Sequence, residues 1–211
     1  MEIELIHSTS PVEYDDAYNK MQEIQHEVIH GNRPSAIWFL EHEEVITAGR
    51  RADTAEILDP GNTPLHHIER GGKLTLHNPG QRVVYFMLDL KKLHGDQPDI
   101  RKLIRSIESA LIEALNKFGV EAEASAENIG IWAKHQGDLC KIASIGLSVK
   151  KWVTMHGIAI NINNDLSAYR KIVPCGLHEV SMTSMTEIMG RTVSLDEFDQ
   201  VFEKCLNNKV F

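Results

Sequence analysis

The feature that most constrains the fold is a run of alternating residues between Lys141 and Ile162. Apolar side chains recur there at every second position: Ala143, Ile145, Leu147, Val149, Ile158, Ile160 and Ile162. Alternation with a period of two is typical of β-strands, in which successive side chains point to opposite faces. With its turn near Lys150 and Lys151, the run predicts a β-hairpin that sets Ser144 roughly opposite Gly157. The small residues of the two strands would then line a narrow slot.

Three other segments show the periodicity of amphipathic helices. They run from about Pro11 to Ile29, from Ile100 to Phe118 and onward from Ser194, which has capping-box spacing to Glu197. Strand-like runs lie between them at 3–7, 36–41, 45–48, 73–77, 82–88 and 129–133. We therefore predict an α+β fold, with a mixed, largely antiparallel sheet and packed helices, formed as a single domain over residues 1–211.

Composition excludes several classes of protein. The 211 residues carry a formal charge of -8, which is the wrong sign for a domain that binds nucleic acid through its phosphates. No apolar run approaches the roughly 20 residues that span a bilayer, and the N-terminus has no signal-peptide pattern. Three cysteines do not make a disulfide framework. We expect a soluble, cytoplasmic protein with reduced thiols and no membrane or nucleic-acid partner.

The sequence contains no convincing motif for binding a metal ion or a nucleotide. His26 and His30 match the H-E-x-x-H pattern of zinc proteases, but both fall opposite the apolar stripe of their predicted helix and should face solvent. The adjacent His66 and His67 are too common a pattern to indicate a metal site, and no C-x-x-C motif is present. The sequence also lacks a phosphate-binding P-loop and a dinucleotide-binding glycine motif. We predict no metal site.

The stretch RGGKLTLHNPGQ at 70–81 has the composition of a binding loop. Two adjacent glycines let backbone approach a ligand or another strand closely, and Arg70 supplies a fixed positive fork of donors. His77 adds a titratable group beside a tight turn. The alternative is an ordinary glycine-rich turn between strands.

The three cysteines differ in their surroundings. Cys205 lies in the apolar stripe of the last helix and should be a core residue, whereas Cys140 points away from the face of its neighbour Lys141. Cys175, between a proline and a glycine, fits a fixed and approachable thiol, with a buried loop cysteine as the alternative. Lys141 has apolar neighbours that could desolvate it, although a surface strand lysine is the simpler interpretation.

Several motifs together resemble one family, the lipoyl(octanoyl) transferases of the biotin/lipoate ligase superfamily. The matching segments are EH and GR within 41–50, RGGKLTLHNPGQ at 70–81, KIASIG at 141–146, HGIAINI at 156–162 and PCG at 174–176. Asn78 stands where the family usually has glycine, and Cys140 is unexpected before the lysine. The resemblance implies a biotin/lipoate protein ligase-like domain.

The resemblance also implies an activity and a site. The family transfers an octanoyl group from octanoyl-acyl carrier protein to a lysine of lipoyl domains, the first step of endogenous lipoate biosynthesis. Cys175 would carry the acyl group as a thioester, and Lys141 would lower the pKa of that thiol. The substrate would be bound by Arg70, Gly71, Gly72, Lys73, Leu74, Thr75, Leu76, His77, Ser144, Ile145, Gly146, Gly157, Ile158 and Ala159.

The implied chemistry needs no cofactor, because a thioester donor is already activated. The implied acceptors are the lipoyl domains of 2-oxoacid dehydrogenase complexes and the glycine cleavage H protein. Since these partners and the carrier are typically acidic, they would bind local basic clusters: Arg50-Arg51, Arg70 with Lys73, and Lys91-Lys92. The alternatives are an ATP-dependent lipoate or biotin protein ligase, which needs no nucleophilic cysteine, and a non-catalytic domain that binds acylated carriers.

Overall fold

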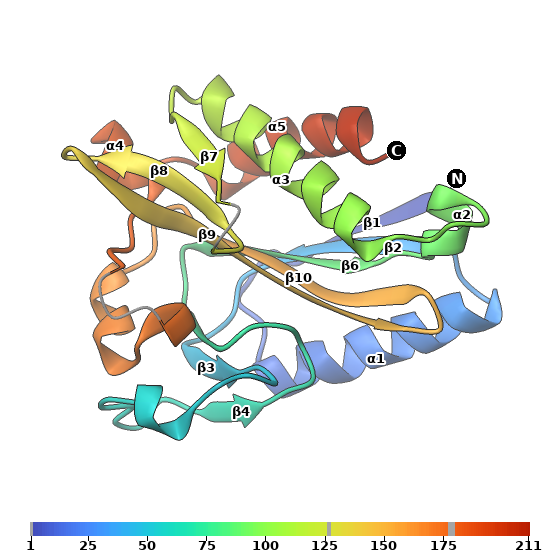
Figure 1. Cartoon of the computed structure of the whole chain (residues 1–211), viewed down its shortest axis with the longest axis horizontal. Helices are drawn as coiled ribbons and strands as arrows, with labels where there is room; N and C mark the ends of the chain where they lie inside the picture. The colour runs from blue at the N-terminus through green and yellow to red at the C-terminus, as the bar shows by residue number, and fades with distance from the viewer. Residues whose placement is uncertain (1, 126–127, 177–179) are drawn as a thin grey trace.

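The computed structural model describes residues 2–125, 128–176 and 180–211 (Figure 1). Its main sheet has seven strands in the order β1-β2-β6-β10-β9-β8-β7, and a smaller sheet has the order β4-β3-β5. The strands are β1 Ile3–His7, β2 Ser35–Leu40, β3 Val45–Ala48, β4 Leu65–His67, β5 Leu74–His77, β6 Gln81–Met87, β7 Ala122–Ala124, β8 Ile131–His135, β9 Asp138–Lys150 and β10 Val153–Asn161. In the main sheet β1 runs parallel to β2 and every other neighbouring pair is antiparallel, which confirms the predicted α+β class.

Helices cover both faces of the main sheet (Figure 1). Helix α1 (Tyr14–His30) lies on one face, and α3 (Ile100–Lys117) and α5 (Leu195–Lys209) lie on the other. Each turns its apolar stripe toward the strands, so the core divides into two clusters separated by the sheet. The three predicted helices are confirmed. The short helices α2 (Leu90–His94) and α4 (Met185–Met189), and the three-residue strands β4 and β7, escaped prediction because they are too short to show a period.

The predicted hairpin of β9 and β10 is present, but its register was wrong. Lys150 pairs with Val153, so the turn consists of Lys151 and Trp152, and Gly157 faces Gly146 where Ser144 was expected. Both turn residues have positive φ, 50° and 68°, as a two-residue type I′ turn requires. Non-glycine residues rarely adopt this conformation, so the residue types at 151 and 152 did not indicate the turn. A turn displaced by one residue moves the pairing by two.

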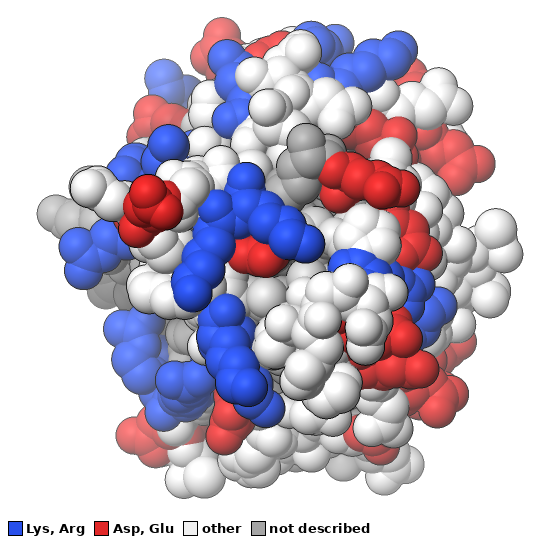
Figure 2. All heavy atoms as spheres, turned by 90° about the vertical axis from the view of Figure 1, so that its right-hand side faces the viewer, with Lys and Arg blue, Asp and Glu red and all other residues white. Residues whose placement is uncertain are grey.

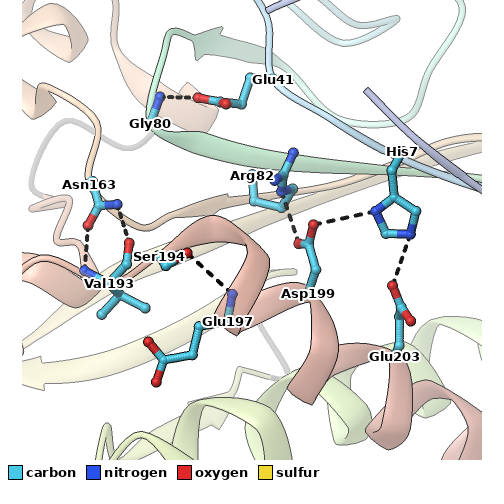
Figure 3. A network of polar contacts seen from close by, with 10 residues as sticks. All are labelled: His7, Glu41, Gly80, Arg82, Asn163, Val193, Ser194, Glu197, Asp199 and Glu203. Atoms are coloured by element: carbon cyan, nitrogen blue, oxygen red, sulfur yellow. Dashed lines mark hydrogen bonds and ion pairs between the residues drawn. The ribbon is translucent and has the colours of Figure 1, made fainter. Parts of the chain in front are cut away.

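A buried ion pair joins α5 to the main sheet (Figure 3). Asp199 of α5 lies 3.0 Å from the guanidinium of Arg82 on β6, and both side chains are almost fully buried. His7 of β1 lies 3.6 Å from the second oxygen of Asp199 and 3.0 Å from Glu203. Its ring stacks on Phe39 at 4.8 Å. These contacts fix α5 across β1 and β6, on the face opposite α1.

Removing one partner of this pair should destabilise the fold. We expect Asp199→Ala to lower the free energy of unfolding by about 3–5 kcal/mol, because it leaves the charge of Arg82 buried and uncompensated. The double variant Arg82→Met with Asp199→Leu should recover most of that loss. Urea denaturation measures both, with the exposed Gln200→Ala on the same helix as the control, expected within about 0.5 kcal/mol of wild type. Equal losses in the single and double variants would contradict this account.

Candidate active site

A cavity of about 490 Å³ lies where the main sheet faces the smaller one. Its floor is the central part of β9 and β10, where Ile145 pairs with Ile158. Its opposite side is the loop at 70–73 and the strand β5. Predicted residues line it as follows: Arg70, Gly71, Gly72, Lys73, Leu74, Thr75, His77, Lys141, Ser144, Ile145, Gly146, Gly157, Ile158 and Ala159. Leu76 was also predicted, but it does not line the cavity, because it packs into the core of the smaller sheet.

The loop at 70–73 passes directly over β9. The N–H of Gly71 donates to the carbonyl of Leu147 at 3.2 Å. A Cβ on Gly146 would lie 3.1 Å from the carbonyl oxygen of Gly71, so a side chain there would push the loop away from the strand. Gly71 and Gly146 thus allow the backbones of the loop and of β9 to approach closely.

Arg70 fastens this loop to the smaller sheet. Its side chain is buried, and its guanidinium donates to the carbonyl and the hydroxyl of Thr47 at 2.8 and 2.9 Å. A third bond, of 2.9 Å, runs to the carbonyl of Gly71. The expectation that Arg70 contributes to a surface for acidic partners is therefore wrong. Its positive charge faces the interior of the site.

Lys141 is buried, with 2% of its surface exposed, so the interpretation as a surface strand lysine is excluded. Its Nζ donates to the carbonyl of Ile129 at 2.8 Å and lies 5.4 Å from the centre of the Trp132 ring. A Cβ on Gly130 would lie 2.6 Å from Cε of Lys141, so that glycine leaves room for the lysine side chain. The adjacent Cys140 is buried, and burial raises the pKa of its thiol.

The short 3₁₀ helix η3 (Pro174–Gly176), which contains Cys175, reaches the same cavity through Gly176. The side chain of Cys175 lies outside the described residues. The chain before η3 is fixed by the N–H of Val173, which donates to the carbonyl of Glu56 at 2.7 Å. Farther along the chain, Ser181 is bonded to β9, because the N–H of Lys141 donates to its carbonyl at 2.9 Å. Cys205, in contrast, is a fully buried core residue, as predicted.

An ion pair between Lys73 and Glu56 lies over Gly176. Glu56 ends the short 3₁₀ helix η1 (Thr54–Glu56) and is buried, whereas Lys73 is half-buried. Sequence reasoning missed Glu56, because a single glutamate in a loop carries no pattern. The pair fixes the wall of the cavity beside the cysteine-bearing helix.

Histidines and tyrosines form a buried polar cluster beside the cavity, in which only His77 was predicted as a site residue. Tyr85 donates to Nε2 of His42 at 2.7 Å, and Nδ1 of His42 donates to the carbonyl of Val12 at 2.8 Å. His77 bonds through Nδ1 to the amide oxygen of Gln81 at 2.7 Å. Burial lowers the pKa of His42 to about 4 and that of His77 to about 3. These rings are therefore neutral at pH 7.

The remaining sequence candidates lie apart from the cavity. His26 and His30 are exposed on α1, as predicted, and Nδ1 of His30 bonds to the carbonyl of His26 at 2.8 Å. Across 2–125, 128–176 and 180–211, no three histidine, cysteine or acidic side chains gather to hold a metal ion. No helix in the same ranges is both long and apolar enough to cross a membrane. Asn78, which replaces the glycine usual in the family, is buried and donates to the carbonyl of Asp165 at 2.9 Å.

Comparison with known proteins shows the family of this chain. Residues 13–207 match the family described as the lipoyl protein ligase A/B catalytic domain. The chain belongs to this family. It is 39% identical over 202 residues to a Rickettsia bellii octanoyltransferase, covering 95% of this chain and 96% of that one. It is 41% identical over 193 residues to a Paramagnetospirillum magneticum octanoyltransferase, covering 91% and 89%. The family predicted from the five motifs is thus confirmed.

Several solved structures share the fold of this chain. The bipartite lipoate protein ligase of Thermoplasma acidophilum aligns with a TM-score of 0.72 and 15% identity, covering 99% of this chain and 82% of that chain. A lipoate-protein ligase A bound with ATP gives a TM-score of 0.71 at 18% identity, covering 99% and 85%. The biotin protein ligase of Aquifex aeolicus gives 0.56 at 14% identity, covering 98% and 70%. The predicted biotin/lipoate ligase-like architecture is confirmed.

The neutral histidines predict a steep loss of stability in acid. A histidine whose pKa is lowered on folding binds fewer protons in the folded state, so the free energy of unfolding falls as the pH drops below about 6.5. For His77 the effect continues to about pH 3. Each such ring contributes a slope of about 1.4 kcal/mol per pH unit within this window.

Urea denaturation between pH 6 and pH 4.5 measures that slope. We expect His77→Gln to reduce it by about 1.4 kcal/mol per pH unit, because glutamine takes up no proton. His26→Gln is the control, since the ring of His26 stays in solvent, and it should keep the wild-type slope. A slope unchanged in His77→Gln would show that His77 is protonated in the folded protein.

Proposed function

We propose that this protein transfers an octanoyl group from octanoyl-acyl carrier protein to a lysine of lipoyl domains through a thioester on Cys175. The observation that carries the proposal is the meeting of the buried amine of Lys141 and the cysteine-bearing helix η3 at one cavity. The family and the octanoyltransferase relatives support the same reaction. Lys141 and Cys175 are the catalytic pair of this proposal.

The first step is an exchange of thioesters. The thiolate of Cys175 attacks the acyl carbonyl, the bond to the carrier sulfur breaks, and the carrier leaves as a thiol after taking up a proton. A positive amine beside a cysteine favours its thiolate form. Lys141 is suited to this role because its Nζ is held by the carbonyl of Ile129 inside the cavity and away from bulk water.

The second step forms an amide. The amine of the acceptor lysine attacks the Cys175 thioester, loses a proton, and releases the cysteine as a thiol. Ile145 and Ile158, which pair on neighbouring strands of the cavity floor, provide an apolar surface for the acyl chain. Burial of each CH₂ group contributes about 0.8 kcal/mol, so an eight-carbon chain gains several kcal/mol.

The acyl-enzyme can be detected directly. Incubation with octanoyl-acyl carrier protein should add one octanoyl group to the wild-type chain, as measured by intact mass. Cys175→Ala should lose the adduct, because no sulfur remains to accept the acyl group. Cys140→Ala is the matched control and should keep the adduct, since that thiol is buried and its pKa is raised.

Other results of that experiment would favour the alternatives. Loss of the adduct in Cys140→Ala would show that Cys140, and not Cys175, accepts the acyl group. An unmodified wild-type mass would support a domain that only binds acylated carriers. Modification of a lipoyl domain by free octanoate, dependent on ATP, would support a ligase.

Acidic partners need a basic surface near the cavity. Arg51 is exposed and lines the cavity, while the exposed Arg50 lies in a neighbouring groove with Lys150 and Lys151. Figure 2 shows the end of the molecule that carries the β9–β10 turn and α2, where lysine and arginine side chains gather near the centre. This distribution supports docking of an acidic carrier or lipoyl domain, although the chain as a whole carries -8.

The docking surface predicts a salt-dependent rate. We expect kcat/KM for octanoyl transfer to fall steeply as the salt concentration rises, because salt screens the attraction between the partners. The double variant Arg50→Glu with Arg51→Glu should lower kcat/KM at low salt and flatten this dependence. Arg101→Glu with Lys102→Glu makes the same change of charge on α3 and serves as the control. A flat wild-type profile, or equal effects of the two double variants, would contradict docking at Arg50 and Arg51.

A further inference from the structure

Strand β9 carries one extra residue where it pairs with β8, and this irregularity lies directly beside Lys141. Trp132 of β8 pairs with Lys141. Its neighbour Ile131 pairs with Ala143, so the pairing skips Ile142 of β9. One extra residue on one of two antiparallel strands is a β-bulge, a feature that is common next to active sites, where it re-aims a side chain.

The bulge turns Lys141 away from the helix-covered core. Consecutive side chains of a regular strand point to opposite faces. Here Ile142 and Ala143 both pack into the apolar cluster beneath α3 and α5. Lys141 therefore takes the opposite face, which it shares with its partner Trp132. Unbroken alternation would place Lys141 on the face of Ala143, so the bulge keeps its ammonium group out of the apolar cluster and in the wall of the cavity.

Trp132 contacts the amine of Lys141 with the face of its ring. Nζ lies over the indole at 5.4 Å from the ring centre, within the roughly 6 Å over which an aromatic face attracts a cation. Tryptophan gives the strongest contact of this kind, and the attraction grows when the partners are removed from water. Both conditions hold, because Trp132 is 5% exposed and Lys141 is 2% exposed.

The same indole also fixes the acceptor of the amine. Nε1 of Trp132 donates to the carbonyl of Asn128 at 3.0 Å. The carbonyl of the next residue, Ile129, accepts from Nζ of Lys141 at 2.8 Å. Both Asn128 and Ile129 line the cavity. One side chain thus touches the amine with its ring face and, through its N–H, ties down the loop that holds the amine.

The backbone of Lys141 does not by itself set the place of the amine. Its N–H donates to the carbonyl of Ser181 at 2.9 Å, and its carbonyl accepts from the N–H of Thr183 at 3.0 Å. These bonds fix the Cα, but a flexible four-carbon stem still separates it from Nζ. Ordering such a stem costs conformational entropy, so contacts at the amine must hold it in place. Trp132 supplies one contact directly and supports another through Asn128.

We propose that Trp132 is a positioning residue of the acyl transfer, and that its ring and its N–H hold the ammonium group of Lys141 where it stabilises the thiolate of Cys175. Trp132 touches no substrate in this scheme and acts through Lys141. The inference rests on the proposed function, because it requires Cys175 to be the nucleophile, and it adds the group that orients the partner of that nucleophile.

The test is the pH dependence of alkylation of Cys175 by iodoacetamide, from which the pKa of the thiol is obtained. Trp132→Leu removes both the ring and the N–H, whereas Trp132→Phe keeps an aromatic face. We expect Trp132→Leu to raise the thiol pKa by at least about half of the rise in Lys141→Met, and Trp132→Phe to raise it by less than the leucine variant does. A Trp132→Leu profile that coincides with wild type would overturn the inference. Equal shifts in the two Trp132 variants would contradict the contribution of the ring.

A double variant distinguishes positioning of Lys141 from a general structural role. In Lys141→Met the amine is absent, so adding Trp132→Leu should leave the thiol pKa where the single Lys141→Met variant already has it. A further rise in the double variant would show that Trp132 acts by another route, which contradicts the proposal. If the leucine variant does not fold, Trp132→Phe decides by the same comparison. Trp152→Leu makes the matched change in the exposed hairpin turn and should keep the wild-type profile.

The same measurements separate the two proposals. If Lys141→Met leaves the profile unchanged, or if octanoyl-acyl carrier protein does not acylate Cys175, the proposed catalytic pair is wrong and this inference falls with it. If Cys175 is acylated and Lys141→Met shifts the profile, but Trp132→Leu does not, only the positioning role of Trp132 is wrong.

Discussion

The passage of the 70–73 backbone over strand β9 is the constraint on which the rest of the site depends. Gly71 bonds to Leu147, and Gly146 leaves space for the carbonyl of Gly71. Arg70 then ties the loop to Thr47 on the smaller sheet. This contact sets how closely the loop approaches β9 at the cavity. The slot between β9, β10 and β5 is thus defined by backbone contacts, with its apolar floor supplied by Ile145 and Ile158.

Two basic side chains, Lys141 and Arg70, are buried beside this slot. Lys141 is buried, and its amino group is held by a backbone carbonyl and an aromatic ring. Arg70 is also buried; burial lowers the pKa of the neighbouring His77 and His156, and the charge of Arg70 lowers it further. The site thus combines fixed positive groups with neutral imidazoles. This suits a reaction in which a thiolate forms at one end and an uncharged acyl chain occupies the other.

Much of the fold could be predicted from the sequence because long periodic segments bury one face. The helix at 100–118 and the hairpin of β9 and β10 are of this kind. The hairpin register was missed because Lys151 and Trp152 form a turn with positive φ that neither residue type favours. The rejected zinc motif at His26 and His30 illustrates that helical phase, and not the motif itself, decided where the rings point.

The site was predictable where function leaves a local motif, as in the glycines at 71, 72 and 146. It was not predictable where single residues meet through the fold. Glu56 joins Lys73 and Gly176 from a loop without pattern, and Tyr14 reaches the cavity from the first turn of α1. His156, whose φ is 65° within β10, stood within a recognised motif, yet only the backbone shows its conformation.

The proposed catalysis requires the amine of Lys141 to act on the thiol of Cys175. The most direct measurement is the pH dependence of the alkylation rate of Cys175 by iodoacetamide, in wild type and in Lys141→Met. We expect a thiol pKa below the usual value of about 8.5 in wild type and a rise of about one unit or more in the variant. An identical pH profile in the two proteins would contradict it.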